Sequence, residues 1–337
     1  MPDSFPSDRI FEMTLNVTAI SKNIVTQASD RRFTNLKTGK TEADEANKAL
    51  VFSCADALLA ITFTGIGSVN LGCVGKSVDQ WLAEVIRDEG LCELRVEKSL
   101  PIIAEKATEW FETFPEEWDK RHAVILAGWQ ELKKEEITAC LWIISNFSPS
   151  RTTYSKRFNI ERLSTNKPLI IAMPNTKAIG RIDRRQLKAE LRNSKTVDEI
   201  EKSVVQLIRR VASKASGVGK SCMSIAISST KQARATYYSK DNLISSYGPY
   251  FLWYYGGRNY CVGESNVMPG GGYNVAFGEP GTVSLVVGGT PSIVSPIEIL
   301  TKFKFSFAEA KHKVNDQVLK GILVTGLQFK PMPENKT

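Results

Sequence analysis

The order of the periodic segments constrains the fold of this chain more than any other feature. Extended segments come in three blocks, and two pairs of helical segments separate these blocks. A doubly wound parallel sheet would need strands and helices to alternate one by one. The block order therefore predicts an α+β fold with sheets in the middle and helix pairs on the outside.

The first half of the chain opens with a β-hairpin. Residues 14–20 alternate in polarity, residues 21–23 form a polar turn, and residues 24–28 form a second extended run. Ser77 is the expected N-cap of the first helix, and Pro115 is expected to end the second. The other predicted elements of this half are strands over 49–54 and 57–63, a glycine turn over 64–67, and helices over 77–89 and 102–114.

The second half repeats the order of strands followed by helices. Two strongly apolar segments, 123–129 and 139–144, flank a charged loop and predict another hairpin. The elements predicted after it are a strand over 168–173, helices over 184–191 and 196–215, and a strand pair over 223–227 and 233–238.

The composition changes beyond about residue 239, where aromatic residues and glycine become frequent. Strands are predicted there over 281–287 and 301–307, and residues 268–273 are predicted to form a flexible loop. The aromatic run at 247–260 is expected to cover a sheet edge or an oligomer interface rather than to stack on nucleic-acid bases. We expect three parts: a leader over 1–13, a main domain over 14–239 and a β-rich C-terminal extension over 240–337.

The composition is that of a water-soluble globular protein, with 42% apolar and 24% charged residues in a chain of 337. No window approaches the roughly 18 uncharged apolar residues that a membrane helix needs. The polar N-terminus also lacks the pattern of a secretory signal. We therefore expect a cytoplasmic protein with no membrane partner.

The residues that hold metals and cofactors are sparse in this chain. Its six cysteines stand singly and only two histidines accompany them, so we expect buried free thiols and no metal site. Two Gly-Lys-Ser segments lack the first glycine of a phosphate-binding loop, since Asn70 and Lys214 stand there, and no cofactor is expected. The net charge of +8 is dispersed among acidic residues. Nucleic acid is thus an unlikely partner, and polyanion binding is the least favoured function.

A resemblance to a known family begins at Thr14. Asp30 follows Thr14 by sixteen residues and Arg32 by eighteen, within a predicted hairpin. The passages that carry the resemblance are 13–20, 28–32, 47–49, 64–67, 124–130 and 215–219. They resemble the proteasome β-subunit family, with the bacterial protease HslV and related N-terminal nucleophile hydrolases as the wider group. The resemblance covers residues 13–239 and implies a four-layer αββα sandwich, a homo-oligomeric ring and a peptide or amide substrate.

The same resemblance implies a threonine-type hydrolase. A threonine hydroxyl is a weak nucleophile, but a free α-amino group, with a pKa of about 8, can take its proton when the threonine is the first residue. Lys48 would then favour the deprotonated oxygen, and Asp30 would hold Lys48 by a charge-assisted hydrogen bond. The backbone N–H of Gly65 would stabilise the oxyanion, an interaction worth about 3 kcal/mol in comparable sites. Arg32, Ser213 and Ser216 are the expected supporting residues.

The residues before Thr14 leave two interpretations open. Self-cleaving members of the family carry glycine before the threonine, whereas this chain has Met13. Translation from Met13 followed by removal of the methionine would also expose the amine of Thr14. The alternative function is that of a catalytically silent subunit with a structural or interaction role.

Overall fold

The structure of the chain is a computed structural model. It describes most of the residues between 14 and 288. The described ranges are 14–34, 41–43, 46–71, 74–133, 136–147, 154–165, 169–173, 179–193, 196–215, 217–229, 233–238, 250–255, 258–268, 272–277 and 284–288. The leader over 1–13, the predicted strand over 301–307 and Ser216 lie outside these ranges.

The smaller of two main sheets has five antiparallel strands in the order β12-β1-β2-β13-β14. Its strands are β1 (Asn16–Ile20), β2 (Ile24–Asp30), β12 (Leu169–Met173), β13 (Cys222–Ser228) and β14 (Ala233–Tyr238). The hairpin predicted from residue 14 onward is confirmed, because β1 and β2 pair antiparallel with Ile20 opposite Val25.

The larger sheet has nine strands in the order β11-β10-β9-β6-β5-β15-β16-β17-β18. All its pairs are antiparallel except β15 with β5, which are parallel. The strands are β5 (Ala49–Ser53), β6 (Ala57–Thr64), β9 (Ala123–Lys133), β10 (Glu136–Phe147), β11 (Tyr154–Arg162), β15 (Tyr250–Tyr255), β16 (Arg258–Met268), β17 (Gly272–Phe277) and β18 (Ser284–Gly288). Two short pairs complete the strands, β3 (Phe33–Thr34) with β4 (Thr41–Ala43) and β7 (Ser68–Leu71) with β8 (Val74–Ser77).

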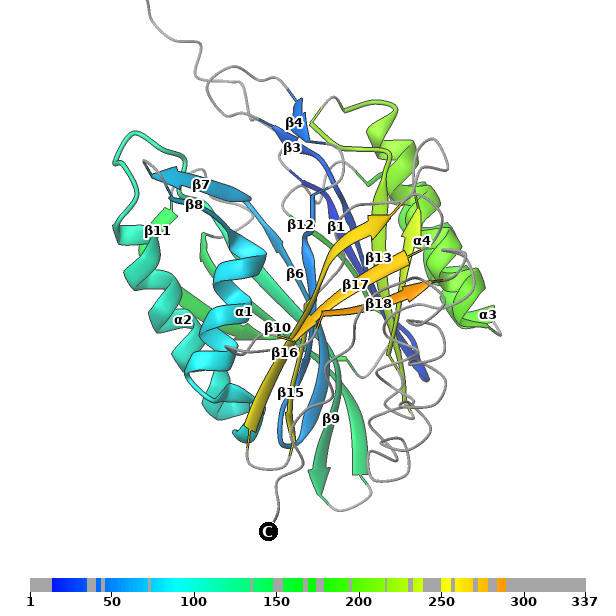
Figure 1. Cartoon of the computed structure of the whole chain (residues 1–337). Helices are drawn as coiled ribbons and strands as arrows, with labels where there is room; N and C mark the ends of the chain where they lie inside the picture. Colours follow the sequence, from blue (N-terminus) through cyan, green and yellow to red (C-terminus); the bar gives the residue numbers. More distant parts are fainter. Residues whose placement is uncertain are drawn as a thin grey trace, which may run out of the picture.

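The helices lie on the outer sides of the two main sheets (Figure 1). They are α1 (Val78–Asp88), a 3-10 turn (Leu91–Glu93), α2 (Val96–Glu112), α3 (Arg181–Asn193) and α4 (Val197–Ala212). One apolar cluster packs α1 and α2 on the nine-stranded sheet, a second packs α3 and α4 on the five-stranded sheet, and a third joins the sheets. The prediction of an α+β fold with central sheets is confirmed in this form.

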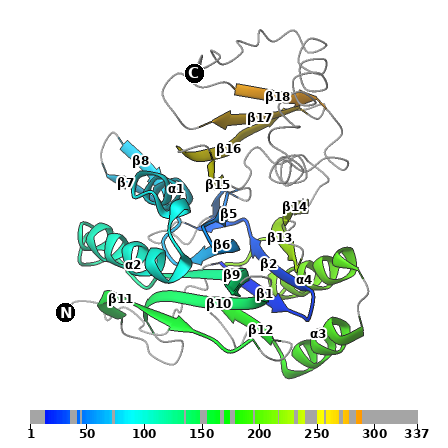
Figure 2. The same ribbon diagram turned by 90° about the horizontal axis from the view of Figure 1, so that it is seen from below.

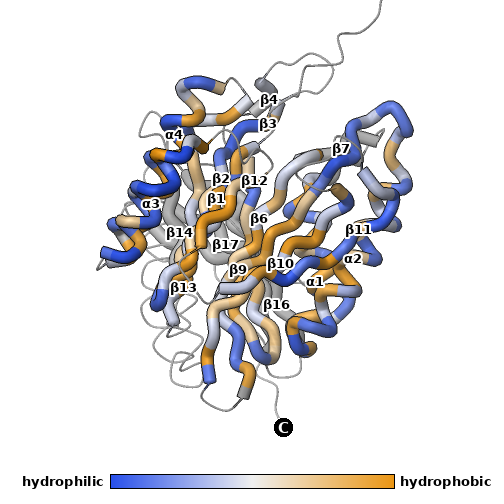
Figure 3. The backbone as a smooth tube through the Cα atoms, turned by 180° about the vertical axis from the view of Figure 1, so that it is seen from behind, coloured by the Kyte–Doolittle hydropathy of each residue, from blue (hydrophilic) through white to orange (hydrophobic). Residues whose placement is uncertain are grey.

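Strand β6 shows why the predicted strands are apolar without interruption. Leu59 and Ile61 belong to the cluster under α1 and α2, whereas Leu58 and Ala60 belong to the cluster between the sheets. A strand buried on both faces has no polar face to alternate with. The tube coloured by hydropathy shows this continuous apolar centre, with α3 polar along its outer side (Figure 3).

Buried hydrogen bonds between described residues cross from one main sheet to the other. Asn16 Nδ2 donates to the carbonyl of Phe63 over 2.7 Å. Gln27 Nε2 donates to the carbonyl of Ile125 over 3.0 Å, and the indole of Trp129 donates to that of Ile227 over 2.9 Å. Each contributes about 1 kcal/mol and also fixes how far one sheet can slide over the other.

The predicted start of the second helix at residue 102 is wrong, because α2 begins at Val96 and contains Pro101. The cap that starts α2 comes from a distant residue, since the Val96 N–H donates to Asp56 Oδ1 over 2.8 Å. Sequence rules look for a cap beside the helix and for proline at its first position. Burial of the apolar face of α2 outweighs the cost of Pro101.

The C-terminal strands continue the larger sheet. Strands β15 to β18 follow β5 in order (Figure 2), and Tyr250 pairs with Leu50 at the junction. Within the predicted strand over 281–287, residues 284–287 belong to β18. Of the predicted loop over 268–273, Met268 ends β16 and Gly272 begins β17, and residues 269–271 lie outside the described ranges. A domain boundary at residue 239 stays a prediction.

Cys54, Cys92, Cys140 and Cys222 are buried and free, as expected from their isolated positions. Among the helices of the described ranges, none combines the length and the apolarity that crossing a membrane requires.

Candidate active site

Thr14 lies two residues before the start of β1 and has an unusual backbone conformation. Its φ angle is +51°, and its side chain is buried. A β-branched residue in this region is strained, at a cost of about 1–3 kcal/mol. The strain persists because the next residue is held twice by Asp30: the Leu15 N–H donates to Asp30 Oδ1 over 2.9 Å, and the Asp30 N–H donates to the Leu15 carbonyl over 3.2 Å.

Lys48 reaches Thr14 from the loop that precedes β5. Its ammonium group donates to Thr14 Oγ1 over 2.6 Å and to the backbone carbonyl of Arg32, and it lies 3.5 Å from Asp30 Oδ2. An ammonium group has three donors, and these three oxygens use all of them. The ring of Phe33 lies 5.1 Å from the Lys48 nitrogen and covers it.

Asp30 is the acceptor that organises this group. Besides Leu15 and Lys48, its carboxylate accepts from the backbone N–H groups of Arg32 and Gly219, each over 3.4 Å. Burial raises the pKa of Asp30, while Lys48 and the three N–H groups oppose that rise. Burial likewise lowers the pKa of Lys48, and the neighbouring carboxylate of Asp30 opposes that shift.

Two glycines are required by the geometry around the site. A Cβ on Gly219 would lie 2.9 Å from Arg32 Cβ, so this close approach to the Asp30 carboxylate needs glycine. Gly65 has a φ of +107°, and a Cβ there would lie 2.2 Å from the carbonyl oxygen of Arg121. Among the described residues, no acceptor takes the N–H of Gly65, which leaves this donor available to a ligand.

The structure brings together most of the predicted site residues. Thr14, Asp30, Lys48 and the backbone of Arg32 form one connected group. Gly65 follows β6 in the other sheet, which is tied to β1 by the bond from Asn16 to Phe63.

Ser213 does not join this group. It is exposed at the end of α4, where its hydroxyl donates to the carbonyl of Arg210 over 2.7 Å. A hydroxyl at the C-terminus of a helix finds a free carbonyl within its own last turn, which explains this position. Ser216 lies outside the described ranges.

A hydrogen-bonded pair beside Lys48 was not predicted from the sequence. Asn47 Nδ2 donates to Asp79 Oδ2 over 2.8 Å, and Asn47 Oδ1 accepts from the Ala49 N–H over 3.3 Å. Asp79 lies in the first turn of α1, after the predicted N-cap Ser77, and burial raises the pKa of its carboxyl. The two bonds clamp the backbone on both sides of Lys48.

His122 was also missed, although it lies next to Gly65. Neither of its ring nitrogens has a hydrogen-bond partner among the described residues. Its ring is completely buried against those of Phe63, Phe111 and Phe158. Burial lowers the pKa of this imidazole to about 3, so the ring is neutral at pH 7.

Comparisons with known proteins give no family assignment. No family model matches the chain, and no curated protein matches it. Similar solved structures include Anbu (ancestral beta-subunit) from Yersinia bercovieri, with 12% identity, 67% of this chain and 88% of that chain covered, and a TM-score of 0.47. Another is the helical assembly of the Anbu complex from Pseudomonas aeruginosa, with 13% identity, 68% and 88% coverage, and a TM-score of 0.48. A third is an Anbu (Gly-1) mutant from Hyphomicrobium sp. strain MC1, with 14% identity, 68% and 88% coverage, and a TM-score of 0.47.

These comparisons correct the expected family. The resemblance of residues 13–239 to proteasome β-subunits and HslV is wrong as an assignment, because no family model or curated protein supports it and the similar structures are Anbu proteins. Short passages around a threonine, an aspartate and a lysine recur among related sites, so they do not separate one family from another.

Proposed function

We propose that this chain is an amide or peptide hydrolase in which Thr14 is the nucleophile and its own α-amine is the general base. The observation that carries the proposal is the 2.6 Å contact between Lys48 Nζ and Thr14 Oγ1. A buried ammonium that donates to a hydroxyl oxygen stabilises the alkoxide and lowers the pKa of the hydroxyl. Asp30 keeps Lys48 in place, and four donors saturate its carboxylate.

The reaction has two halves. In the first, the amine takes the proton of Thr14 Oγ1, the oxygen attacks the substrate carbonyl, and the C–N bond breaks as the leaving amine receives that proton. In the second, the amine takes a proton from water, and the resulting hydroxide attacks the ester on Thr14. The carboxylic acid leaves, and the proton returns to Oγ1. The N–H of Gly65 is the proposed donor to the oxyanion in both halves.

The strained backbone of Thr14 supports a working form that begins at this residue. The φ torsion exists only while Met13 is attached, so removal of residues 1–13 would relieve about 1–3 kcal/mol of strain and create the amine. Cleavage of the leader and initiation at Met13 both lead to this form.

The proposal extends to the architecture. We propose that the three apolar clusters define a four-layer αββα sandwich. Strands β15 to β18 would then be an addition to its larger sheet. The homo-oligomeric ring stays a prediction.

One observation favours the alternative of a silent structural or interaction subunit. In a chain that keeps Met13, the nitrogen of Thr14 is an amide and has no lone pair for base catalysis. The same Lys48 and Asp30 contacts would then serve only to hold β1, β2 and β5 together.

The test combines the mass of the natively produced protein with its turnover of a panel of fluorogenic peptide amides. We expect a chain that begins at Thr14 and turns over, no turnover after Thr14→Ala, and partial turnover after Thr14→Ser. A native product that retains residues 1–13 and is inactive would establish the silent subunit. Turnover retained in Thr14→Ala would exclude Thr14 as the nucleophile.

A further inference from the structure

A cavity of about 340 Å³ opens beside the nine-stranded sheet, where α2 ends and β10 meets β11. It lies at the same end of the strands as Gly65. The end of β6, the start of β9, the end of β10 and the start of β11 follow one another across the sheet at this end. The residues that line it are Phe111, Glu112, Glu116, Lys120, Asn146, Tyr154, Ser155 and Lys156.

The inner wall of the cavity is held rigidly by Asn146. Its side chain donates to the Lys120 carbonyl over 2.8 Å and accepts from the His122 N–H over 2.8 Å. Its own N–H donates to the His122 carbonyl over 3.3 Å. Asn146 is only 3% exposed, so these bonds are shielded from water and the wall is preorganised.

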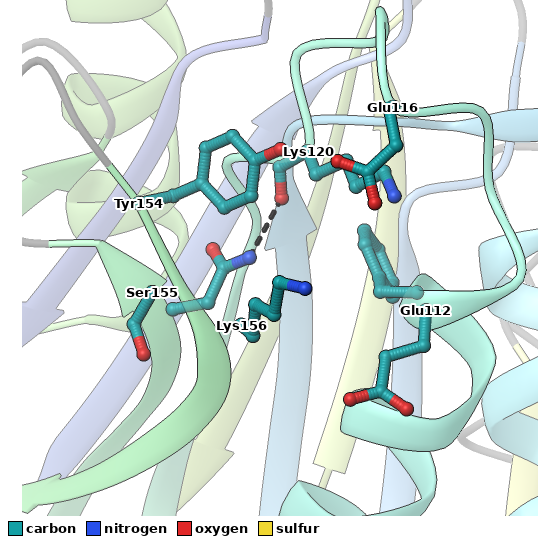
Figure 4. A pocket seen from close by; sticks show the side chains of 8 residues that line it. Glu112, Glu116, Lys120, Tyr154, Ser155 and Lys156 are labelled. Atoms are coloured by element: carbon teal, nitrogen blue, oxygen red, sulfur yellow. Dashed lines mark hydrogen bonds between the residues drawn. The ribbon is translucent and has the colours of Figure 1, made fainter.

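The charges in the cavity are of both signs. Lys120 is only 6% exposed as a residue, and its side chain points toward Glu116 (Figure 4). A ligand carboxylate that accepts hydrogen bonds from a lysine ammonium in this sheltered place would gain a charge-assisted contact. Figure 4 shows the amine of Lys156 reaching into the space between Tyr154 and Glu116.

The C-terminal end of α2 favours a positively charged ligand group. Glu112 is the last residue of this helix, and Glu116 follows within the next turn of chain. Two carboxylates and the negative end of a helix dipole favour a cation here. The two lysines and two glutamates cancel in formal charge, which disfavours a phosphate or another dianion.

We propose that this cavity binds a small zwitterion, an apolar or aromatic α-amino acid or a dipeptide. Its carboxylate lies between Lys120 and Lys156, its ammonium group faces Glu116, and its side chain lies against the ring of Phe111. The volume is at the small end of the range of roughly 300–1,000 Å³ found for ligand pockets, which excludes longer peptides. The site is separate from Thr14 and does not depend on the proposed hydrolysis.

The test is a calorimetric titration of the whole chain carrying Thr14→Ala, so that binding is measured without turnover. The probes are phenylalanine, leucine and leucyl-leucine, with 3-phenylpropionate, phenethylamine and inorganic phosphate as comparisons. We expect saturable binding of at least one zwitterion, with at least tenfold weaker binding of the two single-charge analogues and of phosphate.

Variants then locate the site. Lys120→Met, Lys156→Gln and Glu116→Gln should each weaken binding at least tenfold, whereas the exposed Lys188→Gln and Glu105→Gln should leave it unchanged. If Lys120→Met fails to fold, the other two variants decide. Absence of saturable binding by every zwitterion, tighter binding of phosphate, or unchanged binding in Lys156→Gln and Glu116→Gln would overturn the proposal.

Discussion

Two fully buried titratable groups lie on either side of β6, and they are built in opposite ways. Lys48 is surrounded by acceptors, and its partner Asp30 is surrounded by donors. His122 is surrounded by aromatic rings, and within the described part of the chain nothing bonds to its nitrogens. Both groups are shifted towards their neutral forms by burial, but only the first has partners that oppose the shift. Burial alone therefore does not decide the charge of a group; the charges and hydrogen bonds around it also act.

The largest expected effect on stability comes from removing one member of the pair formed by Lys48 and Asp30. Lys48→Met should lower the free energy of unfolding by about 3–5 kcal/mol, because it leaves Asp30 buried without its cation. It should also abolish hydrolysis. Denaturant unfolding measures the first effect, and the double variant Lys48→Met with Asp30→Asn is the control. If the double variant is no more stable than the single one, the pairing explanation is wrong.

The unsaturated histidine should reveal itself through pH. Its folded pKa of about 3 lies below the ordinary value of 6.5, so the unfolded chain binds more protons between these values. The free energy of unfolding should therefore fall as the pH falls below 6.5, by about 1.4 kcal/mol per pH unit from this group, until the pH reaches about 3.

The matched variant for that measurement is His122→Phe, which keeps a ring and removes the titration. Between pH 6 and 4, the stability of this variant should depend less steeply on pH than that of the wild type, while at pH 7 the two should be similar. Equal slopes in the two proteins would show that His122 is protonated or hydrogen-bonded in the folded state.

Gly65 lies between the Lys48 group and His122, and Gly65→Ala should have an intermediate effect on the free energy of unfolding. The added Cβ would meet the Arg121 carbonyl, and alanine is strained at a φ of +107°, so we expect a loss of about 1–3 kcal/mol in stability. Turnover should fall as well if Gly65 donates to the oxyanion. Gly180→Ala is the control, because a Cβ there would lie 3.3 Å from a carboxylate oxygen of Asp183 rather than from backbone.

The smallest expected effect concerns the clamp beside Lys48. Asn47→Ala removes the donor to Asp79 and should lower the free energy of unfolding by about 1–2 kcal/mol, measured against the exposed Asn159→Ala. Turnover should fall more than stability predicts, because Lys48 loses its fixed backbone. Unchanged turnover in a folded Asn47→Ala protein would show that Asp30 alone positions the lysine.

The helices and strands of this fold were largely predictable from the sequence, whereas the distant residues that bond to them were not. The hairpin of β1 and β2 and the helices α1 and α4 follow from local periodicity, and they were found within a few residues. The start of α2 was missed because its cap, Asp56, is forty residues away.

The candidate site was predicted in part. Thr14, Asp30 and Lys48 were expected from the resemblance to proteasome β-subunits, which is wrong as an assignment, and the structure places their side chains in contact. Their catalytic roles stay a prediction. Asp79 and His122 carried no local signal, since an aspartate in a first helical turn and a histidine at a strand end are ordinary on a surface.

The sequence by itself determined which segments are strands and helices, because periodicity and turn chemistry act over a few residues. Only the tertiary structure decided that the Lys48 amine lies 2.6 Å from Thr14 Oγ1 and that Asp79 holds Asn47, the residue before Lys48. It also decided that the two sheets exchange hydrogen bonds through Asn16 and Gln27. The physical reason is that desolvation and hydrogen-bond saturation depend on what surrounds a group in space, and that environment forms only when distant segments pack together.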